Sequence, residues 1–107
     1  MIESSVEKVV DMVAYQPGSV VSRKILGRKG GNVTLFAFAE GEGLTEHTSP
    51  FEALVVVLDG TAQIRVGDEE HAVAAGEAMV LPAGVPHALE ARARFKMMLT
   101  MIREGGG

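Results

Sequence analysis

Short apolar segments alternate with turn residues along most of this chain of 107 residues. Glycine, proline, asparagine and aspartate recur about every 8–12 residues, which is typical of an all-β sandwich or barrel. The segments between these turns predict strands at 20–26, 33–39, 51–58, 62–66, 71–73, 78–81, 87–90 and 95–102. Residues 2–13 form a short helix or an irregular arm, and no long helix is predicted elsewhere.

The strands at 51–58 and 95–102 carry apolar residues at successive positions, whereas the strand at 62–66 alternates apolar and polar residues. Alternation gives one buried and one wet face, but a continuous apolar run needs cover on both faces. This surplus of apolar surface predicts a homodimer packed through a sheet. The alternative is that the N-terminal arm covers the face within the same chain. The residues of the arm that could provide this cover are Ile2, Val6, Val9 and Val10.

A two-residue turn is predicted at Asp59-Gly60, between an apolar segment and an alternating one. Both central residues of a type I′ turn need positive φ, which aspartate and glycine tolerate best. The pattern therefore predicts a β-hairpin that joins the strands on either side of this pair.

Composition indicates one globular domain over residues 1–107, since 47% of the residues are hydrophobic and the length suits a single core. No apolar run approaches the roughly 18 residues of a membrane span, so no membrane association is expected. Within the domain, residues 1–19 form the arm and the glycine-rich tail 104–107 is expected to be flexible. The start mixes charges with short apolar pieces, unlike a secretory signal, and this favours the cytoplasm.

The formal net charge of -4 argues against nucleic-acid binding, which needs a basic face. The one basic cluster surrounds a glycine-rich turn, and a solvated hairpin tip is a simpler interpretation than an anion site. It consists of Arg23, Lys24, Arg28 and Lys29. The absence of cysteine excludes disulfides, zinc-thiolate sites and cysteine nucleophiles, so any metal must be held by histidine, carboxylate or water. No serine-hydrolase elbow, P-loop or Rossmann glycine pattern is present.

The segments GEGLTEHTSPFEALVVVLDG at 41–60 and GEAMVLPAGVPH at 76–87 resemble the paired motifs of the cupin superfamily. In the second motif a glycine, a Pro-x-Gly turn and a histidine follow at fixed spacing, and this chain matches it throughout, ending at His87. The first motif places a glycine, a His-x-His pair, a glutamate and a final glycine. Its first histidine is His47, but Ser49 and Ala53 occupy the positions of the second histidine and the glutamate.

This resemblance covers residues 33–102 and implies a cupin-type jelly-roll β-barrel, also called a double-stranded β-helix, which is commonly dimeric. In the family the motif positions hold a divalent metal such as Fe, Mn, Ni or Zn. Here His47 and His87 remain as metal ligands, whereas Ser49 offers only a neutral hydroxyl and Ala53 has no donor atom. Glu52 would replace the lost carboxylate only if its strand is bulged, because a shift of one residue turns a side chain to the opposite face.

The six methionines indicate an adaptable apolar interior. Met97, Leu99 and Met101 stand at alternate positions of one predicted strand and therefore share a face. We expect them to line a ligand cavity together with His47, Ser49 and His87; core filling is the alternative role.

Three functions are compatible with these features, and the sequence identifies no catalytic residue. The first is binding of a small, largely apolar molecule in the barrel interior, with His47 and His87 contacting its polar group. The second is a metal-dependent cupin enzyme of the dioxygenase, isomerase or decarboxylase type, in which a non-standard third ligand completes the site. The third is a vestigial barrel that acts in dimerisation or partner binding.

Overall fold

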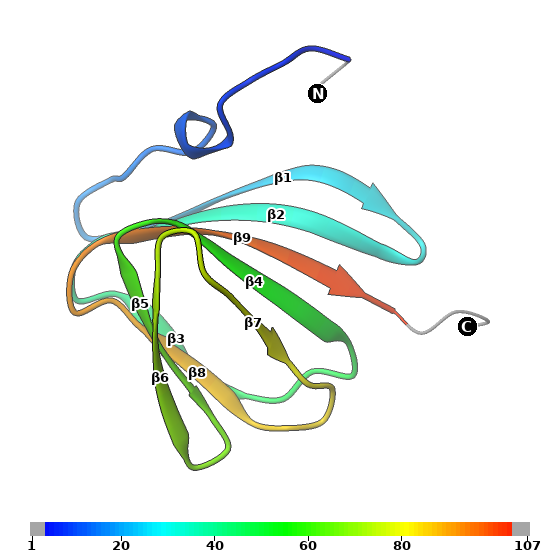
Figure 1. Cartoon of the computed structure of the whole chain (residues 1–107), viewed down its shortest axis with the longest axis vertical. Helices are drawn as coiled ribbons and strands as arrows, with labels where there is room; N and C mark the ends of the chain where they lie inside the picture. Colours follow the sequence, from blue (N-terminus) through cyan, green and yellow to red (C-terminus); the bar gives the residue numbers. More distant parts are fainter. Residues whose placement is uncertain (1–3, 104–107) are drawn as a thin grey trace.

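The computed structural model describes residues 4–103, so the predicted flexible tail at 104–107 and the predicted contact of Ile2 lie outside the described residues. Within this range two antiparallel sheets face each other (Figure 1). The five-stranded sheet contains, in order, β1 (Val20–Arg28), β2 (Gly31–Phe38), β9 (Phe95–Ile102), β4 (Glu52–Asp59) and β7 (Ala78–Leu81). The four-stranded sheet contains β3 (Gly43–His47), β8 (His87–Glu90), β5 (Thr61–Val66) and β6 (Glu69–Ala74).

The all-β prediction is confirmed, and each predicted strand is present. β3 is an additional strand that the apolar pattern did not predict, because Leu44 is its only apolar residue. The arm contains one 3-10 turn, η1 (Val9–Asp11). Among residues 4–103, no helix is long and apolar enough to cross a membrane.

The main core lies between the two sheets. The rings of Phe38 and Phe95 stack there with centroids 4.6 Å apart and an interplanar angle of 11°. Along the inner face of β9, Phe95 and Met97 are fully buried, whereas Leu99 and Met101 are only partly buried. The barrel is therefore tightly closed at its Phe95 end and less tightly packed towards Met101.

Asp59 and Gly60 do not form the predicted hairpin. β4 pairs with β7 and β9, while β5 pairs with β6 and β8, so the strands on either side of this turn belong to different sheets. Gly60 has a φ of 75°, but no non-glycine residue among those described has positive φ, which excludes a type I′ turn. The prediction was wrong because turn chemistry specifies a reversal locally, whereas strand pairing depends on distant partners. A corner between the sheets lets Val57 and Ala62 both face the core.

Gly60→Ala is expected to lower the free energy of unfolding by more than roughly 3 kcal/mol. An added Cβ would lie 2.4 Å from the carbonyl oxygen of Arg94, and the positive φ would itself be strained. Gly76→Ala is the matched control, because Gly76 has a φ of 88° and open space around the added carbon. Urea unfolding of both variants should show a clearly larger loss for Gly60→Ala. Equal losses would mean that the close approach at Arg94 has no energetic weight.

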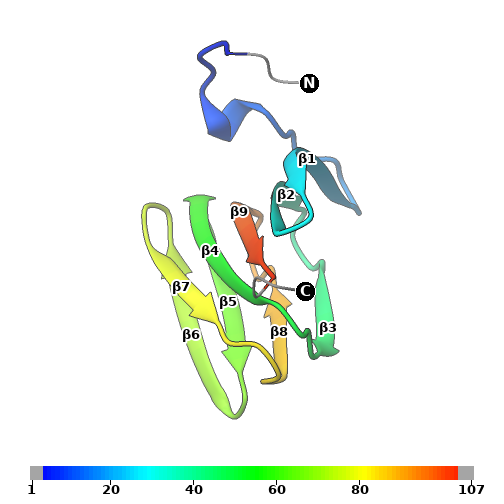
Figure 2. The ribbon, with the colours of Figure 1, turned by 90° about the vertical axis from the view of Figure 1, so that its right-hand side faces the viewer.

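The N-terminal arm covers part of the outer face of the five-stranded sheet (Figure 2). Met12 and Val13 are buried there against Leu35 and Ala37. The intramolecular cover expected as an alternative to a dimer is therefore present over this part. Met12 and Val13 provide most of it, whereas Val6, an expected contact, is 101% exposed.

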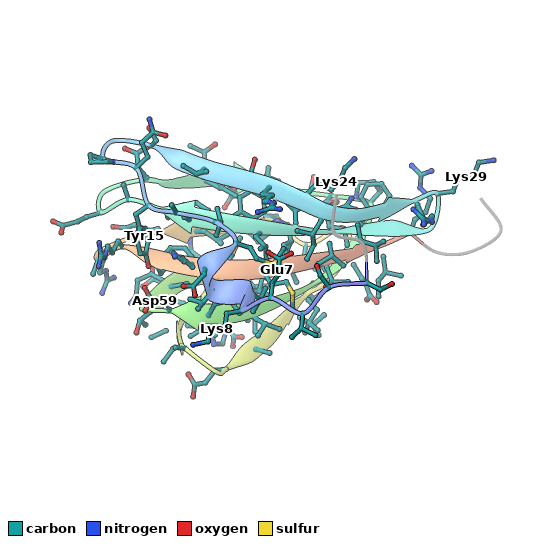
Figure 3. The ribbon with its side chains drawn as sticks, turned by 90° about the horizontal axis from the view of Figure 1, so that it is seen from above. Glu7, Lys8, Tyr15, Lys24, Lys29 and Asp59 are labelled. Carbon is teal, nitrogen blue, oxygen red and sulfur yellow. The ribbon has the colours of Figure 1, made fainter. Side chains whose placement is uncertain are left out.

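Polar contacts fasten the arm to the barrel. The hydroxyl of Tyr15 donates to Oδ2 of Asp59 at 2.6 Å, and the guanidinium of Arg94 lies 4.4 Å from the Tyr15 ring centroid (Figure 3). Burial and the hydrogen bond to Asp59 raise the pKa of Tyr15, so its hydroxyl remains a donor at neutral pH. Nζ of Lys96 donates to the carbonyl of Val10 at 2.7 Å. Asp59 thus anchors the arm instead of shaping a hairpin.

The rest of this outer face carries a continuous band of mostly apolar side chains, which we call the apolar row. The strand register places one of its members on each of the five strands, in the order Leu26, Val33, Thr100, Leu54 and Val80. The large side chains at both ends of the row, and Leu54 beside its centre, are exposed. The predicted surplus of apolar surface is therefore present on the part of the face that the described arm leaves open.

Candidate functional site

His47 and His87 lie directly opposite each other at one end of the barrel. His47 is the last residue of β3, His87 is the first of β8, and the register pairs them. Between the Leu44–Leu89 pair and the histidine pair β3 contains one extra residue, so a bulge brings His47 into register with His87. We call this end the mouth of the barrel; β3 and β9 end here, and β2, β4 and β8 begin here.

The two imidazole rings are in direct contact. Their centroids are 4.3 Å apart at an interplanar angle of 70°, and their Nε2 atoms are separated by 3.1 Å. Nδ1 of His47 lies 2.8 Å from the carbonyl oxygen of Thr45, and Nδ1 of His87 lies 3.3 Å from that of Val85. Because a carbonyl oxygen only accepts, each Nδ1 carries the hydrogen, and in the neutral rings both Nε2 lone pairs point at one place. The pair is therefore suited to a proton, a ligand donor or a metal ion.

The two carbonyls that orient the rings could not be predicted from the sequence. Each belongs to the residue two positions before its histidine, Thr45 in one case and Val85 in the other. Every residue carries a backbone carbonyl, so the residue types give no signal for this role. Only the path of the chain before each histidine reveals it.

His87 is only 6% exposed, and this burial lowers its pKa. The charge that a protonated His47 would carry lowers the pKa further, and the hydrogen bond to the Val85 carbonyl opposes both effects. Buried imidazole is penalised mainly in its charged form. His87 is consequently neutral at pH 7 and offers its Nε2 as an acceptor or ligand.

Stability should fall as the pH falls below about 6.5, the ordinary histidine pKa. The unfolded chain binds a proton at His87 more readily than the folded protein does, so protonation favours unfolding. The melting temperature of chelator-treated protein should thus drop between pH 7.5 and pH 5, and His87→Gln should lose part of this dependence. His71→Gln is the control, because His71 is exposed. An unchanged pH dependence in His87→Gln would contradict the burial argument.

Ser49 is engaged by the loop in which it lies. β3 ends at His47, so the regular strand that would have turned Ser49 inward does not reach it. Its Oγ accepts the backbone N–H of Phe51 at 3.1 Å, and its carbonyl accepts that of Gly84 at 2.9 Å. Ser49 therefore links the loop between β3 and β4 to the loop between β7 and β8.

Ala53 and Glu52 lie on opposite faces of β4. Ala53 is buried on the inner face but has no donor atom, and Glu52 is exposed. The pairing of β4 with β9 is regular from Glu52 to Val57, so the bulge that Glu52 would need as a ligand is not found. Across residues 4–103, no group of three or more metal-ligating His, Cys, Asp or Glu side chains is present. The described donor set is therefore the two imidazoles.

Met97, Leu99 and Met101 share the inner face of β9, opposite Val57, Val55 and Ala53 of β4. Met97 is 1% exposed and belongs to the packed core, which matches the alternative role of core filler. Leu99 and Met101 pack against the core but remain partly accessible. These two residues are better placed than Met97 to meet a molecule that enters from the mouth.

Residues 34–103 match the sequence model of the cupin domain. The chain therefore belongs to the cupin family, and the resemblance found in its motifs is confirmed. It is similar to a conserved protein of unknown function from Streptococcus pyogenes, with 31% identity and a TM-score of 0.93 over 99% of this chain and 93% of that one. It is also similar to a cupin 2 conserved barrel domain protein from Leptotrichia buccalis, with 39% identity and a TM-score of 0.85.

The alignment with the Leptotrichia buccalis protein covers 88% of this chain but only 46% of that one. A cupin superfamily protein from Desulfitobacterium hafniense has a TM-score of 0.90 at 22% identity over 97% of this chain and 95% of that one, which supports the fold alone. No curated protein matches the chain. These relatives establish the jelly-roll barrel, and the chemistry has to be argued from the site itself.

Proposed function

We propose that this protein is a cytoplasmic cupin that binds a small, largely apolar molecule in the barrel interior, with His47 and His87 contacting the polar group of that molecule. The observation that carries the proposal is the convergence of the two Nε2 atoms at 3.1 Å, with both Nδ1 atoms engaged by backbone carbonyls. Two acceptors that converge this closely favour a ligand that presents a hydroxyl, an N–H or an acid proton to them. Catalysis is not required for this function.

The apolar part of the molecule would meet the inner wall of the barrel. Leu99 and Met101 are partly accessible there, and Met101 pairs with Ala53, whose small side chain replaces the larger glutamate of the family motif. Apolar pockets with a few convergent polar groups are the usual form of small-molecule sites. A thioether side chain such as Met101 also adapts to guests of varied shape.

Native mass spectrometry of the purified protein, followed by identification of the released molecules, tests this proposal. We expect a small molecule that co-purifies with the wild type and is depleted in His87→Ala, while His71→Ala retains it because His71 is on the surface. The same three proteins should then be titrated with octanol as a defined apolar probe. A wild type that carries no small molecule and does not bind octanol would overturn the proposal.

A second candidate function is a metal-dependent enzyme, and the spacing of the histidines favours it. Two nitrogens bound at ~2.1 Å to one ion, at ordinary coordination angles, are ~3.0–3.4 Å apart. The observed 3.1 Å between the Nε2 atoms fits this range. His47 and His87 would hold an Fe, Mn, Ni or Zn ion whose other positions go to water or a chelating substrate, and the ion would supply Lewis-acid or oxygen-activating chemistry. The fit is partial, because Ser49 and Ala53 add no available donor.

Elemental analysis by inductively coupled plasma mass spectrometry separates the two functions. Protein purified without a tag or chelator should be compared with His47→Ala, His87→Ala and the surface control His71→Ala. Near-stoichiometric metal in the wild type and in His71→Ala, lost from the other two variants, would favour the enzyme. Trace metal in every sample would favour the binding protein.

We also propose that two copies pair through the apolar row, so the expected homodimer is retained on a defined surface. The row contains no charged residue, so it can face a second copy of itself across a two-fold axis without opposing like charges. Leu26, Leu54 and Val80 are 54%, 38% and 53% exposed along it. A vestigial barrel whose role is this pairing alone is the third candidate function.

Light scattering coupled to size-exclusion chromatography tests the pairing. Leu54→Asp should yield a folded monomer because a charge is placed within the row. Gln63→Asp adds the same charge to the four-stranded sheet and should remain dimeric. A monomeric wild type, or a dimer that survives Leu54→Asp, would contradict the proposed surface.

A further inference from the structure

A pocket of about 200 Å³ lies at the mouth of the barrel, on the side formed by the β1–β2 hairpin and the end of β9. Its lining residues come from three distant parts of the chain. They are Arg28, Lys29, Gly31, Asn32, Phe51, Met101 and Arg103. Met101 belongs both to this pocket and to the partly buried inner wall, so the pocket adjoins the barrel interior. Phe51 lies on the loop that leaves His47, which connects the pocket to the histidine side of the mouth.

The pocket gathers three cations, Arg28, Lys29 and Arg103, in a chain whose formal net charge is -4. Among residues 4–103, no carboxylate lies within salt-bridge distance of any of them. Cations gathered around a concave surface concentrate positive potential there. This pocket is therefore electrostatically matched to an anion.

Arg103 is held in place from two directions. Its guanidinium lies 5.1 Å from the ring centroid of Phe51, and its backbone N–H donates to the carbonyl of Gly30 at 2.8 Å. Such stacking restrains an arginine side chain while leaving its N–H donors free for a planar acid group. Asn32 also lines the pocket, and its Oδ1 accepts the hydroxyl of Thr34, which leaves the amide hydrogens of Asn32 as donors.

The basic cluster seen in the sequence is divided by the fold. Nη1 of Arg23 donates to the carbonyl of Met12 and so fastens the arm, whereas Arg28 and Lys29 line the pocket. Lys24 and Lys29 lie towards the hairpin end of the sheet, away from Tyr15 and Asp59 (Figure 3). A solvated hairpin tip accounts for exposed lysines. It does not explain why Arg103 and Phe51, from distant parts of the chain, line the same pocket.

We infer that Arg28, Lys29 and Arg103 form an anion subsite that binds the carboxylate of the apolar molecule whose body enters the barrel. This inference rests on the proposed binding function and narrows its ligand class to amphipathic carboxylates. Both Nδ1 hydrogens are engaged by backbone carbonyls, so the histidine pair turns acceptors rather than donors towards a ligand and does not suit a carboxylate. The charged end is therefore better placed at the basic pocket. The molecule that fits has an apolar body, one carboxylate, and a hydroxyl or N–H for the histidines.

Calorimetric titration with octanoate, octanol and octylamine tests the subsite at low salt. We expect octanoate to bind at least tenfold more tightly than octanol, and octylamine most weakly. Arg103→Gln and Arg28→Gln should each weaken octanoate binding about tenfold while leaving octanol binding unchanged. Arg92→Gln is the matched control, because it removes the same charge from the exposed loop before β9. Raising NaCl from about 50 to 500 mM should weaken only octanoate binding.

Inorganic phosphate, followed by amide chemical shifts, separates failure of the subsite from failure of the barrel function. Shifts at Gly31 and Asn32 that vanish in Arg103→Gln, without binding of any octyl compound, would support the subsite and overturn the barrel function. Equal affinity for octanol and octanoate would overturn the subsite and leave the barrel function standing. The subsite is likewise overturned if Arg92→Gln weakens octanoate binding as much as Arg103→Gln, or if phosphate shifts neither amide.

Discussion

Val57→Asp is expected to leave the protein unfolded at 25 °C. Val57 is fully buried on the inner face of β4 and belongs to the main core. The substitution removes apolar packing and places an unpaired carboxylate among apolar side chains, at a cost of more than roughly 5 kcal/mol. A small domain has a total stability of only about 5–15 kcal/mol. Loss of β-sheet circular dichroism and of dispersed amide resonances is the expected readout.

Leu54→Asp provides the matched control for this result. Leu54 lies three residues earlier on the same strand, but on the outer face and 38% exposed. In the monomer that this variant is expected to form, the carboxylate is in contact with water, so the loss within the subunit should be about 1 kcal/mol or less and the fold should persist. If Val57→Asp instead melted at the wild-type temperature, the inner face assigned to Val57 would be wrong.

The sequence was sufficient to predict most of the strands because the pattern of apolar and polar residues along each of them reflects which of its faces is buried. β4 and β9 are apolar on both faces, and in the structure each is an interior strand of the five-stranded sheet. β3 is a strand of mostly exposed residues held by its pairing with β8, so hydrophobicity gave no signal for it. Pairing itself was not predictable locally, which is why Asp59-Gly60 was misread as a hairpin.

For the candidate site, spacing predicted which histidines matter but not how they are held. His47 and His87 are far apart in the chain and reach contact only because β3 and β8 pair with a bulge. Ser49 was expected beside them on the assumption of a continuous strand, yet β3 stops at His47 and the Ser49 hydroxyl caps its own loop. The anion pocket depends on Arg103 and Phe51 meeting across the fold, a contact that no local pattern encodes.

The substitutions at Ser49 and Ala53 change what the histidine pair can do. In the family pattern a second histidine and a carboxylate would complete the metal set, whereas here position 53 on the inner face of β4 offers only a methyl group. The alanine at position 53, in place of the family's glutamate, also removes a negative charge from the mouth of the barrel. A mouth without that carboxylate, and with Arg28, Lys29 and Arg103 beside it, is better suited to an incoming organic acid. We therefore expect this pair of replacements to weaken metal binding and to favour anionic ligands.

The double variant Ser49→His with Ala53→Glu should therefore regain metal affinity. Loss of an outer hydrogen-bond partner alone typically costs 10–100-fold in metal affinity, so a direct carboxylate ligand at position 53, on the inner face of β4, should gain more than ~100-fold. Titration of the chelator-treated protein with Zn²⁺ or Ni²⁺ measures the gain, and addition of His87→Ala should abolish it.

Ser49→His with Leu54→Glu is the control for this experiment, because it introduces the same residue types but places the carboxylate on the outer face of β4. It should remain close to the wild type in metal affinity. Equal metal affinities for the two double variants, with both folded, would show that a side chain at position 53 does not face the histidine pair. The jelly-roll fold would stand in that case, but the motif alignment that matches Ala53 to the lost glutamate would have to be abandoned.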